Sequence, residues 1–146
     1  MQEEEEHFSV KEKRLGVRLW SNLSRSYISR FRRSNEFLRE WHLSSAQFDV
    51  LTLIGSHARL SQKELAEKLM VTKGNITQIL RKMEDAGYII REQEWKTKYL
   101  SLTEKGTVLF NEILPMQEAF QASLFQTLTK KERKQLLKLL KKVNRE

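Results

Sequence analysis

The chain has 146 residues, of which 39% are hydrophobic, and it contains one Pro, five Gly and a formal net charge of +8. This size suits one compact domain or two small lobes that share helices, and the composition is that of a helix-rich globular protein. The sequence has no Cys, which excludes disulfides, thiolate metal sites and a catalytic cysteine. It also has no apolar run of the roughly 18 residues that a membrane span needs, and its start, MQEEEEHFSVKEKR, is acidic where a signal peptide is basic, so we expect a cytoplasmic protein.

Basic side chains are concentrated near the two ends of the sequence. Residues 7–43 carry nine basic and three acidic side chains and residues 129–146 carry eight and two, whereas residues 44–103 carry nine and seven. A surplus of this kind favours a polyanionic partner, but bulk charge alone does not identify one. Within the centre, residues 72–83 contain three basic side chains and no acid. This short segment therefore predicts a local basic face.

The first predicted helix spans about residues 11–38. Its apolar residues recur every four positions and mark one helical stripe. The stripe contains Leu15, Leu19, Leu23, Tyr27 and Phe31. A straight helix of this length would measure roughly 40 Å, against a radius of gyration of about 15 Å for a compact chain of this size. It would protrude unless a second chain covered it, or unless the segment RRSN at residues 32–35 broke it in two.

Two short helices follow, each with a recognisable start. SSAQFDVLTLIG combines Ser44 as a cap with Gln47 three residues later, and Gly55 marks its expected end. LSQKELAEKL repeats the pattern with Ser61 and Glu64. In such capping boxes the two side chains satisfy backbone N–H groups that a helix start leaves without partners.

A third helix is predicted to begin two residues after the second, within the stretch LMVTKGNITQIL. Thr72 is its expected cap and Gly87 its expected stop. Its buried side is expected to contain Ile76, Ile79, Leu80 and Met83. Two short amphipathic helices joined by so tight a turn, the second with a polar first turn, are typical of a helix-turn-helix.

Beyond this helix the apolar pattern changes to a period of two. Tyr88 and Ile90, and then Tyr99 with the run LSLT, predict a β-hairpin whose strands are separated by REQEWKTK. The separating segment contains neither Gly nor Asn, so the position of the turn stays open. Thr103 and Thr129 then cap two further helices, of which the last is rich in Leu and Lys.

Helix, helix, tight turn, helix and hairpin make a winged helix-turn-helix, and here the chain resembles the MarR family of bacterial transcription regulators. The motifs that carry the resemblance are SSAQFDVLTLIG, LSQKELAEKLMVTKGNITQILRKMEDAGYI and YLSLTEKG. The likeness extends from about Leu15 to Val143. It implies a fold that is mostly α with a small β-hairpin wing, in which a winged helix-turn-helix core is flanked by long dimerisation helices.

The resemblance also implies how the chain is organised and what it binds. We expect an acidic N-terminal tail at 1–10, an N-terminal dimerisation helix region at 11–43, a winged helix-turn-helix DNA-binding lobe at 44–103 and C-terminal dimerisation helices at 104–146. The Lys-rich last helix is interpreted as a dimer helix with a solvated outer face, in preference to a membrane-surface helix. The expected function is a transcriptional regulator, a repressor, that binds a pseudo-palindromic operator in double-stranded DNA as a homodimer. The alternative is a winged-helix module that binds protein or RNA without an operator, because the fold does not fix the function.

The candidate DNA contacts lie on the third helix. Its first turn contains Thr72, Lys73, Gly74 and Asn75. A helix N-terminus presents N–H groups and a positive dipole end to a phosphate, and a glycine lets the backbone approach closely. One turn later, the face that points away from the buried stripe contains Thr77, Gln78, Arg81 and Lys82. Such a face meets base edges when a helix enters the major groove, where Gln suits adenine and Arg suits guanine.

The predicted wing departs from the family pattern. Relatives usually carry Asp-Arg-Arg before the second wing strand, with an arginine entering the minor groove, whereas this chain has Glu94, Trp95 and Lys96 in a shorter hairpin. Tryptophan cannot supply the positive charge that a narrow minor groove attracts. Trp95 is therefore expected either to stack or to pack under the wing, while Lys96 or Lys98 contacts phosphate.

Relatives bind small, often aromatic and anionic effectors between the dimer helices and the winged lobe, which implies an effector pocket here. Trp20, Tyr27 and Phe48 are the candidate lining residues by their positions, and packing in the core is the alternative reading of each. The three His residues lack metal-ligand spacing, and the sequence shows no nucleophile triad or phosphate loop. We therefore expect no metal, no cofactor and no catalysis.

Overall fold

The computed structural model describes residues 7–69 and 73–145, and it is mostly helical with a small antiparallel sheet. In chain order the elements are α1 (Val10–Leu38), the 3-10 helix η1 (Arg39–Trp41), α2 (Ser45–Ser56), β1 (Leu60–Ser61), α3 (Gln62–Leu69), α4 (Lys73–Asp85), β2 (Ile89–Glu94), β3 (Thr97–Leu102), α5 (Glu104–Ser123) and α6 (Lys130–Val143). The predicted winged helix-turn-helix order is confirmed by this succession of α2, α3, α4 and hairpin.

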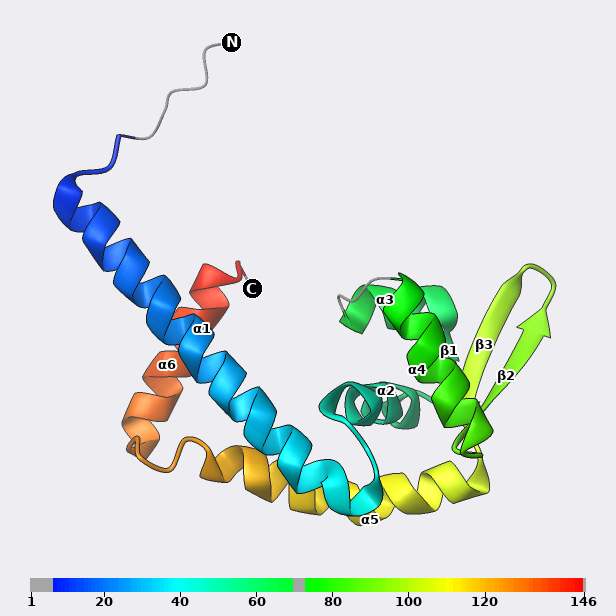
Figure 1. Ribbon diagram of the computed structural model, residues 1–146. Coiled ribbons are helices and arrows are strands. Elements are labelled where there is room, and N and C mark those ends of the chain that lie inside the picture. Colours follow the sequence, from blue (N-terminus) through cyan, green and yellow to red (C-terminus); the bar gives the residue numbers. More distant parts are fainter. Residues whose placement is uncertain (1–6, 70–72, 146) are drawn as a thin grey trace, which may run out of the picture.

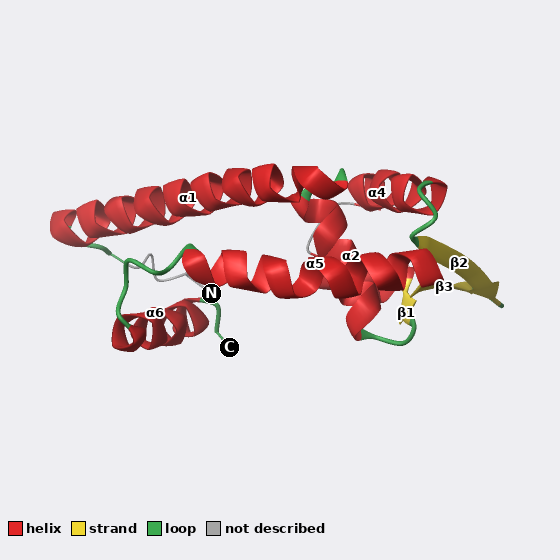
Figure 2. Cartoon of the chain, turned by 90° about the horizontal axis from the view of Figure 1, so that it is seen from below, coloured by secondary structure: helices red, strands yellow, loops and turns green. Residues whose placement is uncertain are grey.

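The molecule has two parts that α5 connects. In Figure 1, α2, α3, α4 and the sheet form one lobe, α1 and α6 lie on the opposite side, and α5 runs beneath both. Figure 2 shows α6 at the end of the molecule farthest from the sheet. The buried apolar core lies within the lobe and where the lobe contacts the end of α1 and the first half of α5. Its fully buried side chains include Leu38, Val50, Leu51, Ile54, Leu65, Ile76, Leu80, Met83, Leu100 and Ile113.

α1 is one continuous helix, so of the two alternatives for this segment the break at residues 32–35 is wrong. The reason lies in the polar side chains of that segment. The Oγ of Ser34 accepts a hydrogen bond of 2.9 Å from Nε2 of Gln117, and Oδ1 of Asn35 accepts one of 2.7 Å from the backbone N–H of Ser45. These side chains therefore bond α1 to α5 and to the start of α2 instead of competing with the helix backbone.

Most of α1 is uncovered. Within Val10–Leu38 only Leu38 is buried, and within Lys130–Val143 of α6 no residue is buried. The residues of the predicted stripe are between 41% and 67% exposed, namely Leu15, Leu19, Leu23, Tyr27 and Phe31. Protein surfaces rarely leave so long an apolar row open to water. Among the helices of the described chain, none has the length and apolar character to cross a lipid bilayer.

Side-chain caps define the helix starts as predicted. The Oγ of Ser44 accepts from the N–H of Gln47 at 3.1 Å while the Gln47 side chain accepts from the N–H of Ser44, and Ser61 accepts from the N–H of Glu64. The helix predicted over SSAQFDVLTLIG ends one residue later than the predicted Gly55, because α2 continues to Ser56. At Gly55 the ring of Phe110 on α5 approaches so closely that a Cβ would lie 2.9 Å from it. This glycine serves helix packing rather than helix termination.

The sheet has the order β1-β3-β2, and all its pairs are antiparallel. The hairpin is longer than its apolar pattern indicated, because the pairing continues to Glu94 opposite Thr97 and leaves only Trp95 and Lys96 in the turn. Most of REQEWKTK is therefore strand. Both faces of the hairpin are mostly exposed there, so the strands carry polar residues on each side. Apolar and polar residues therefore do not alternate, and the sequence shows no period-two signal.

The start of α5 is packed tightly against the link between α4 and β2. Gly106 is buried, and a Cβ there would lie 2.0 Å from the carbonyl oxygen of Tyr88. That oxygen also accepts a hydrogen bond of 3.0 Å from the N–H of Thr103, and the hydroxyl of Thr103 donates to the carbonyl of Gly87. A side chain at Gly106 would separate α5 from the link between α4 and β2.

We therefore predict that Gly106→Ala lowers the free energy of unfolding by at least about 2 kcal/mol, since backbone must move to admit the methyl group. Gly16→Ala is the matched control: it lies on exposed α1 with no atom within 4 Å of the added Cβ. That change should raise stability by up to about 1 kcal/mol through helix propensity. Urea unfolding at one fixed protein concentration measures both, and equal stability of Gly106→Ala and the unmodified chain would contradict the proposed contact.

Candidate nucleic-acid interface

α4 has a buried side and a polar side, as its sequence predicts. Ile76, Leu80 and Met83 are at most 1% exposed, and Ile79 is half-buried against the same core. The opposite side is exposed at Asn75, Thr77, Gln78, Arg81 and Lys82. The helical spacing of the two sets places them on opposite faces. The polar residues therefore lie on the solvent-facing side of the helix, while the apolar ones fix its rotation about its axis.

The sequence predicted a cap at the start of α4 and a stop at its end. Thr72, the predicted cap, lies outside the described residues, and Lys73 and Gly74 are the first two residues of the helix. At the other end, Gly87 has φ 81°, and the N–H of Tyr88 donates to the carbonyl of Met83 at 3.0 Å. This is the left-handed glycine stop that the sequence predicted.

A groove of about 450 Å³ lies between α4 and β2 and contains a residue that sequence reasoning missed. It is lined by Thr77, Arg81, Glu84, Asp85 and Arg91. Arg91 of β2 pairs with the carboxylate of Glu84, so one of the two acids at the end of α4 is neutralised within the chain. Arg91 belongs to the segment interpreted as a turn, and only its place on a strand beside α4 brings it to this surface.

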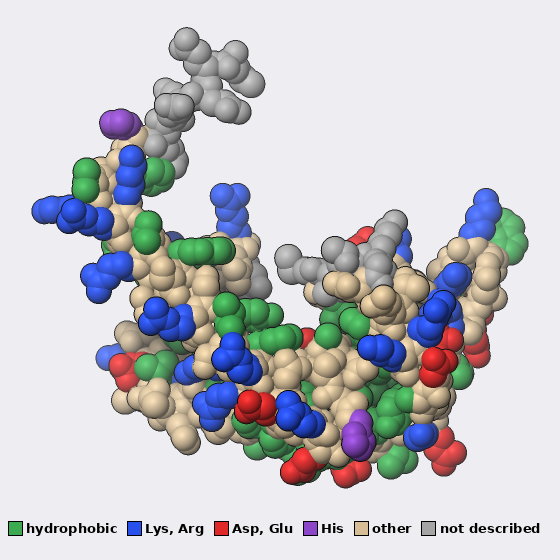
Figure 3. Space-filling view, viewed as in Figure 1, with side chains coloured by type: hydrophobic (Ala, Val, Ile, Leu, Met, Phe, Trp, Pro, Cys, Tyr) green, Lys and Arg blue, Asp and Glu red, His purple; other side chains and the backbone are tan. Residues whose placement is uncertain are grey.

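The wing carries basic side chains to its tip. Lys96 and Lys98 are exposed, and Figure 3 shows Lys and Arg side chains along the wing. Trp95 is 93% exposed, so it does not pack under the wing, and that one of the two sequence-based alternatives is wrong. The reason is the two-residue turn, which points the indole out at the tip, with φ of Trp95 at 58°.

A second residue absent from the sequence-based set supports the wing from its side. Nη2 of Arg59, in the link between α2 and β1, lies 2.7 Å from Oε1 of Glu94. The Arg59 guanidinium also stacks 3.6 Å from the ring centroid of Tyr99. The hydrogen bond to Glu94 raises the pKa of Arg59, so this group stays charged. Arg59 reaches the wing because β1 directly after it pairs with β3. A strand of two residues gives no recognisable pattern in the sequence, so this position could not be predicted.

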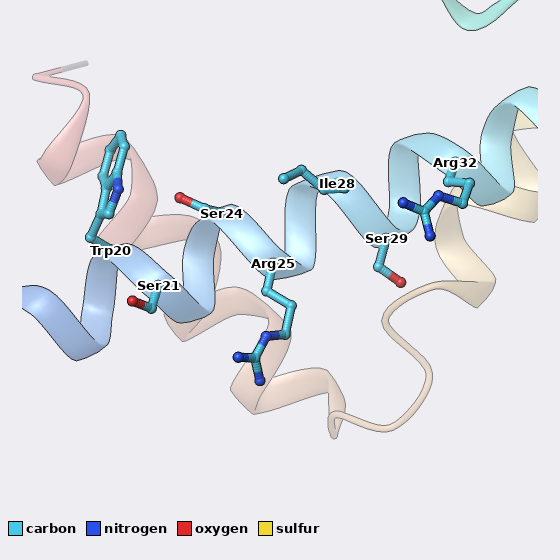
Figure 4. Close-up of a pocket in the computed structure, with 7 residues that line it drawn as sticks. All are labelled: Trp20, Ser21, Ser24, Arg25, Ile28, Ser29 and Arg32. Carbon is cyan, nitrogen blue, oxygen red and sulfur yellow. The ribbon is translucent and has the colours of Figure 1, made fainter.

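The three candidate effector residues are not brought together. Phe48 is 4% exposed within the core, whereas Trp20 and Tyr27 are 72% and 67% exposed on α1. Trp20 lines a shallow groove of about 490 Å³ with Ser21, Ser24, Arg25, Ile28, Ser29 and Arg32, a set that includes neither Tyr27 nor Phe48. Figure 4 shows Trp20, Ser24 and Ile28 along one edge of α1 and Arg25 along the other. A ligand on this single helix would need a second wall.

Metal-binding side chains do not gather in the part of the chain that the structure describes. Across residues 7–69 and 73–145, no group of three His, Cys, Asp or Glu side chains has the geometry to hold a metal ion. The arrangement on α4 and the wing is instead suited to contacts with a polyanion, because it combines exposed amide and guanidinium donors with ammonium groups.

Comparison with known proteins agrees with this geometry. The model of the MarR family matches residues 43–94. An HTH-type transcriptional regulator of Bacillus cereus is 43% identical over 137 residues, which cover 93% of each chain. These relatives are transcriptional regulators and not enzymes.

Solved structures share the fold over nearly the whole chain. A mutant of E. coli MarR in complex with operator DNA has a TM-score of 0.80 and 26% identity, covering 87% of this chain and 94% of the other. BpsR of Bordetella bronchiseptica, at 19% identity, has a TM-score of 0.81 and covers 87% of this chain and 98% of its own, which supports the fold. The chain therefore belongs to the MarR family of transcriptional regulators.

Proposed function

We propose that this regulator binds a pseudo-palindromic operator as a homodimer and represses transcription by occupying that site. The observation that carries the proposal is the exposed face of α4, on which Gln78, Arg81 and Lys82 project opposite the buried stripe. Residues 72–83 contain no acid, so phosphates meet no like charge along this part of the helix. An α-helix fits the major groove of B-DNA, where such donors distinguish bases.

The side chains of α4 and the wing divide into two roles. Gln78 and Arg81 would reach base edges, because a planar amide and a guanidinium can each form two hydrogen bonds to one base. Lys73, Lys82 and Lys98 would contact phosphates, which fix the register of the helix without reading sequence. The E. coli relative whose structure contains operator DNA supports DNA as the partner.

A second copy of this chain is the partner that the uncovered stripe of α1 favours. The stripe that includes Leu19, Leu23 and Tyr27 is 41% to 67% exposed, and an identical stripe on a second copy is complementary to it in a two-fold dimer. Two copies of α4 would then meet two half-sites about 34 to 36 Å apart on one face of the duplex. The same partner would give the groove beside Trp20 and Arg25 its second wall, and that enclosed site would suit a small aromatic anion as effector.

The base-reading role of Gln78 can be tested with one substitution. Gln78→Ala should change the preferred base at one position in each half-site, with a cost of about 1 to 3 kcal/mol at that position. Gln121→Ala, an exposed change on α5, should leave the preference as it was. Binding to a panel of single-base operator variants measures this, and an equal loss on every duplex would refute a base contact.

The phosphate role of Lys73 makes a different prediction. Lys73→Ala should weaken binding to operator and random duplex alike, and the slope of affinity against salt concentration should become shallower by about one released counterion per lost contact. Lys131→Ala on α6 is the control and should keep the original slope. A salt titration by fluorescence anisotropy separates the two, and salt-insensitive association would favour a protein partner instead of DNA.

The dimer can be tested at the stripe itself. Leu23→Glu should convert the protein to a monomer, because it would bury a carboxylate in an apolar interface. Ile90→Glu introduces the same charge at an exposed apolar position of the lobe and should leave the assembly unchanged. Sedimentation equilibrium measures the mass of each, and a dimeric Leu23→Glu protein would remove α1 from the interface.

A further inference from the structure

The tip of the wing carries an indole that the fold itself does not use. Trp95 is the most exposed of the described large hydrophobic side chains, at 93%. Its φ of 58° lies in the left-handed region, which a bulky side chain adopts only at a cost. Glycine or asparagine would relieve that cost at a turn position. An exposed apolar ring on an unfavourable backbone conformation indicates that a partner uses the ring.

Several contacts hold the wing behind this ring. Arg59 pairs with Glu94 directly before the turn and stacks on Tyr99 of the neighbouring strand. On the turn itself, Nε2 of Gln93 donates a hydrogen bond of 3.2 Å to the carbonyl oxygen of Trp95. The hairpin is thus braced from the lobe and closed across its tip. These contacts hold the indole in one position relative to the lobe, which a flexible loop would not do.

The charge around the indole identifies the class of partner. Lys96 follows it in the turn and Lys98 lies on β3, and both ammonium groups are exposed. An apolar protein pocket would have to desolvate these charges, whereas duplex DNA places phosphates beside an apolar base stack. The surroundings of Trp95 therefore favour nucleic acid over an apolar protein surface.

The position of the wing also brings Trp95 to the same duplex as α4. Figure 1 shows the wing tip and the N-terminal end of α4 on the same side of the molecule. A strand of six residues, as in β2, spans about 20 Å, and half a helical turn of duplex separates a major groove from the next minor groove by about 17 Å. The wing is long enough to reach that minor groove while α4 occupies the major groove.

We propose that Trp95 is a wedge that enters a base step in the minor groove beside each half-site and partly unstacks it. This inference rests on the operator binding proposed above and adds a second source of specificity. Apolar side chains that enter a base step kink the duplex, and pyrimidine–purine steps such as TA and CA open most easily. Trp95 thereby selects a deformable step outside the bases that α4 reads.

The test uses full-length protein and a duplex selected from a random-sequence library, with 2-aminopurine placed singly at successive flanking positions. The unmodified protein should raise 2-aminopurine fluorescence at one flanking step per half-site, since unstacking relieves quenching. Trp95→Ala should abolish that rise and weaken binding about tenfold or more, the usual value of a base–aromatic stack. Trp95→Gly, which adopts the turn without strain, should be at least as stable and lose the signal equally.

Lys96→Ala is the matched control at the neighbouring turn position. It should weaken binding with a shallower salt slope and keep the fluorescence rise, because it removes a phosphate contact and leaves the indole in place. Replacing the flanking TA or CA step by a stiffer step should weaken the binding of the unmodified protein to the duplex. The same replacement should leave the binding of Trp95→Ala unchanged.

Two outcomes overturn the inference, and they are distinguishable. In the first outcome, the unmodified protein protects the half-sites, and Trp95→Ala binds and unstacks the duplex as strongly as the unmodified protein. The wedge role of Trp95 is then wrong and the proposed function stands. If no duplex is preferred over random DNA and Trp95 is instead protected by a protein partner, both the wedge and the operator-binding proposal fail.

Discussion

The apolar side of α4 is the constraint on which the rest of the surface depends. Ile76, Leu80 and Met83 are removed from water almost completely, and their burial leaves only one rotation of the helix about its axis. Burying side chains of this size contributes about 1.5 to 3 kcal/mol each, which far exceeds any preference of the polar residues for one direction. The polar face is exposed because its neighbours are buried, and its binding chemistry follows from that packing.

Polar contacts between α1 and the rest of the chain set where this face lies relative to the uncovered stripe. Gln117 bonds to Ser34, and Asn35 accepts from the backbone of Ser45 at the start of α2. Gln117 is only 2% exposed, and a buried hydrogen bond is expensive to leave unmade. These directional contacts fix the angle between α1 and the lobe more narrowly than apolar packing alone would. Two copies joined through α1 would therefore present their recognition helices at a defined separation.

The features that the sequence predicted correctly are those set by local rules. The capping residues Ser44 and Thr129, the inward stripe of α4 and the stop at Gly87 each depend on neighbours within a few residues. Helical periodicity and cap chemistry act over that range, so a single sequence contains enough information to predict them.

The features that the sequence did not reveal depend on partners distant in the chain. Gly55 looked like a helix end, but its lack of a side chain serves the ring of Phe110 on α5. Arg59 and Arg91 join the candidate surface only through strand pairing, and the polar strands of the wing lack the alternation that would have indicated that pairing. The candidate effector residues were chosen by helix position alone, and burial separates Phe48 from the two on α1.

α5 is packed at its first turn against the link between α4 and β2 and bonded at its far end to α1, so a tilt of α5 would move α4. Its first turn is held against Tyr88 through Gly106, and Nζ of Lys105 bonds to the carbonyl of Ala86 at 2.8 Å. Its far end bonds to α1, where Arg30 donates to the carbonyl of Leu124. Across its 20 residues, a length of about 30 Å, a tilt of about 5° moves one end by about 2.5 Å. A small pivot at the α1 end would thus shift α4 by about three quarters of the roughly 3.4 Å between base pairs without melting any element.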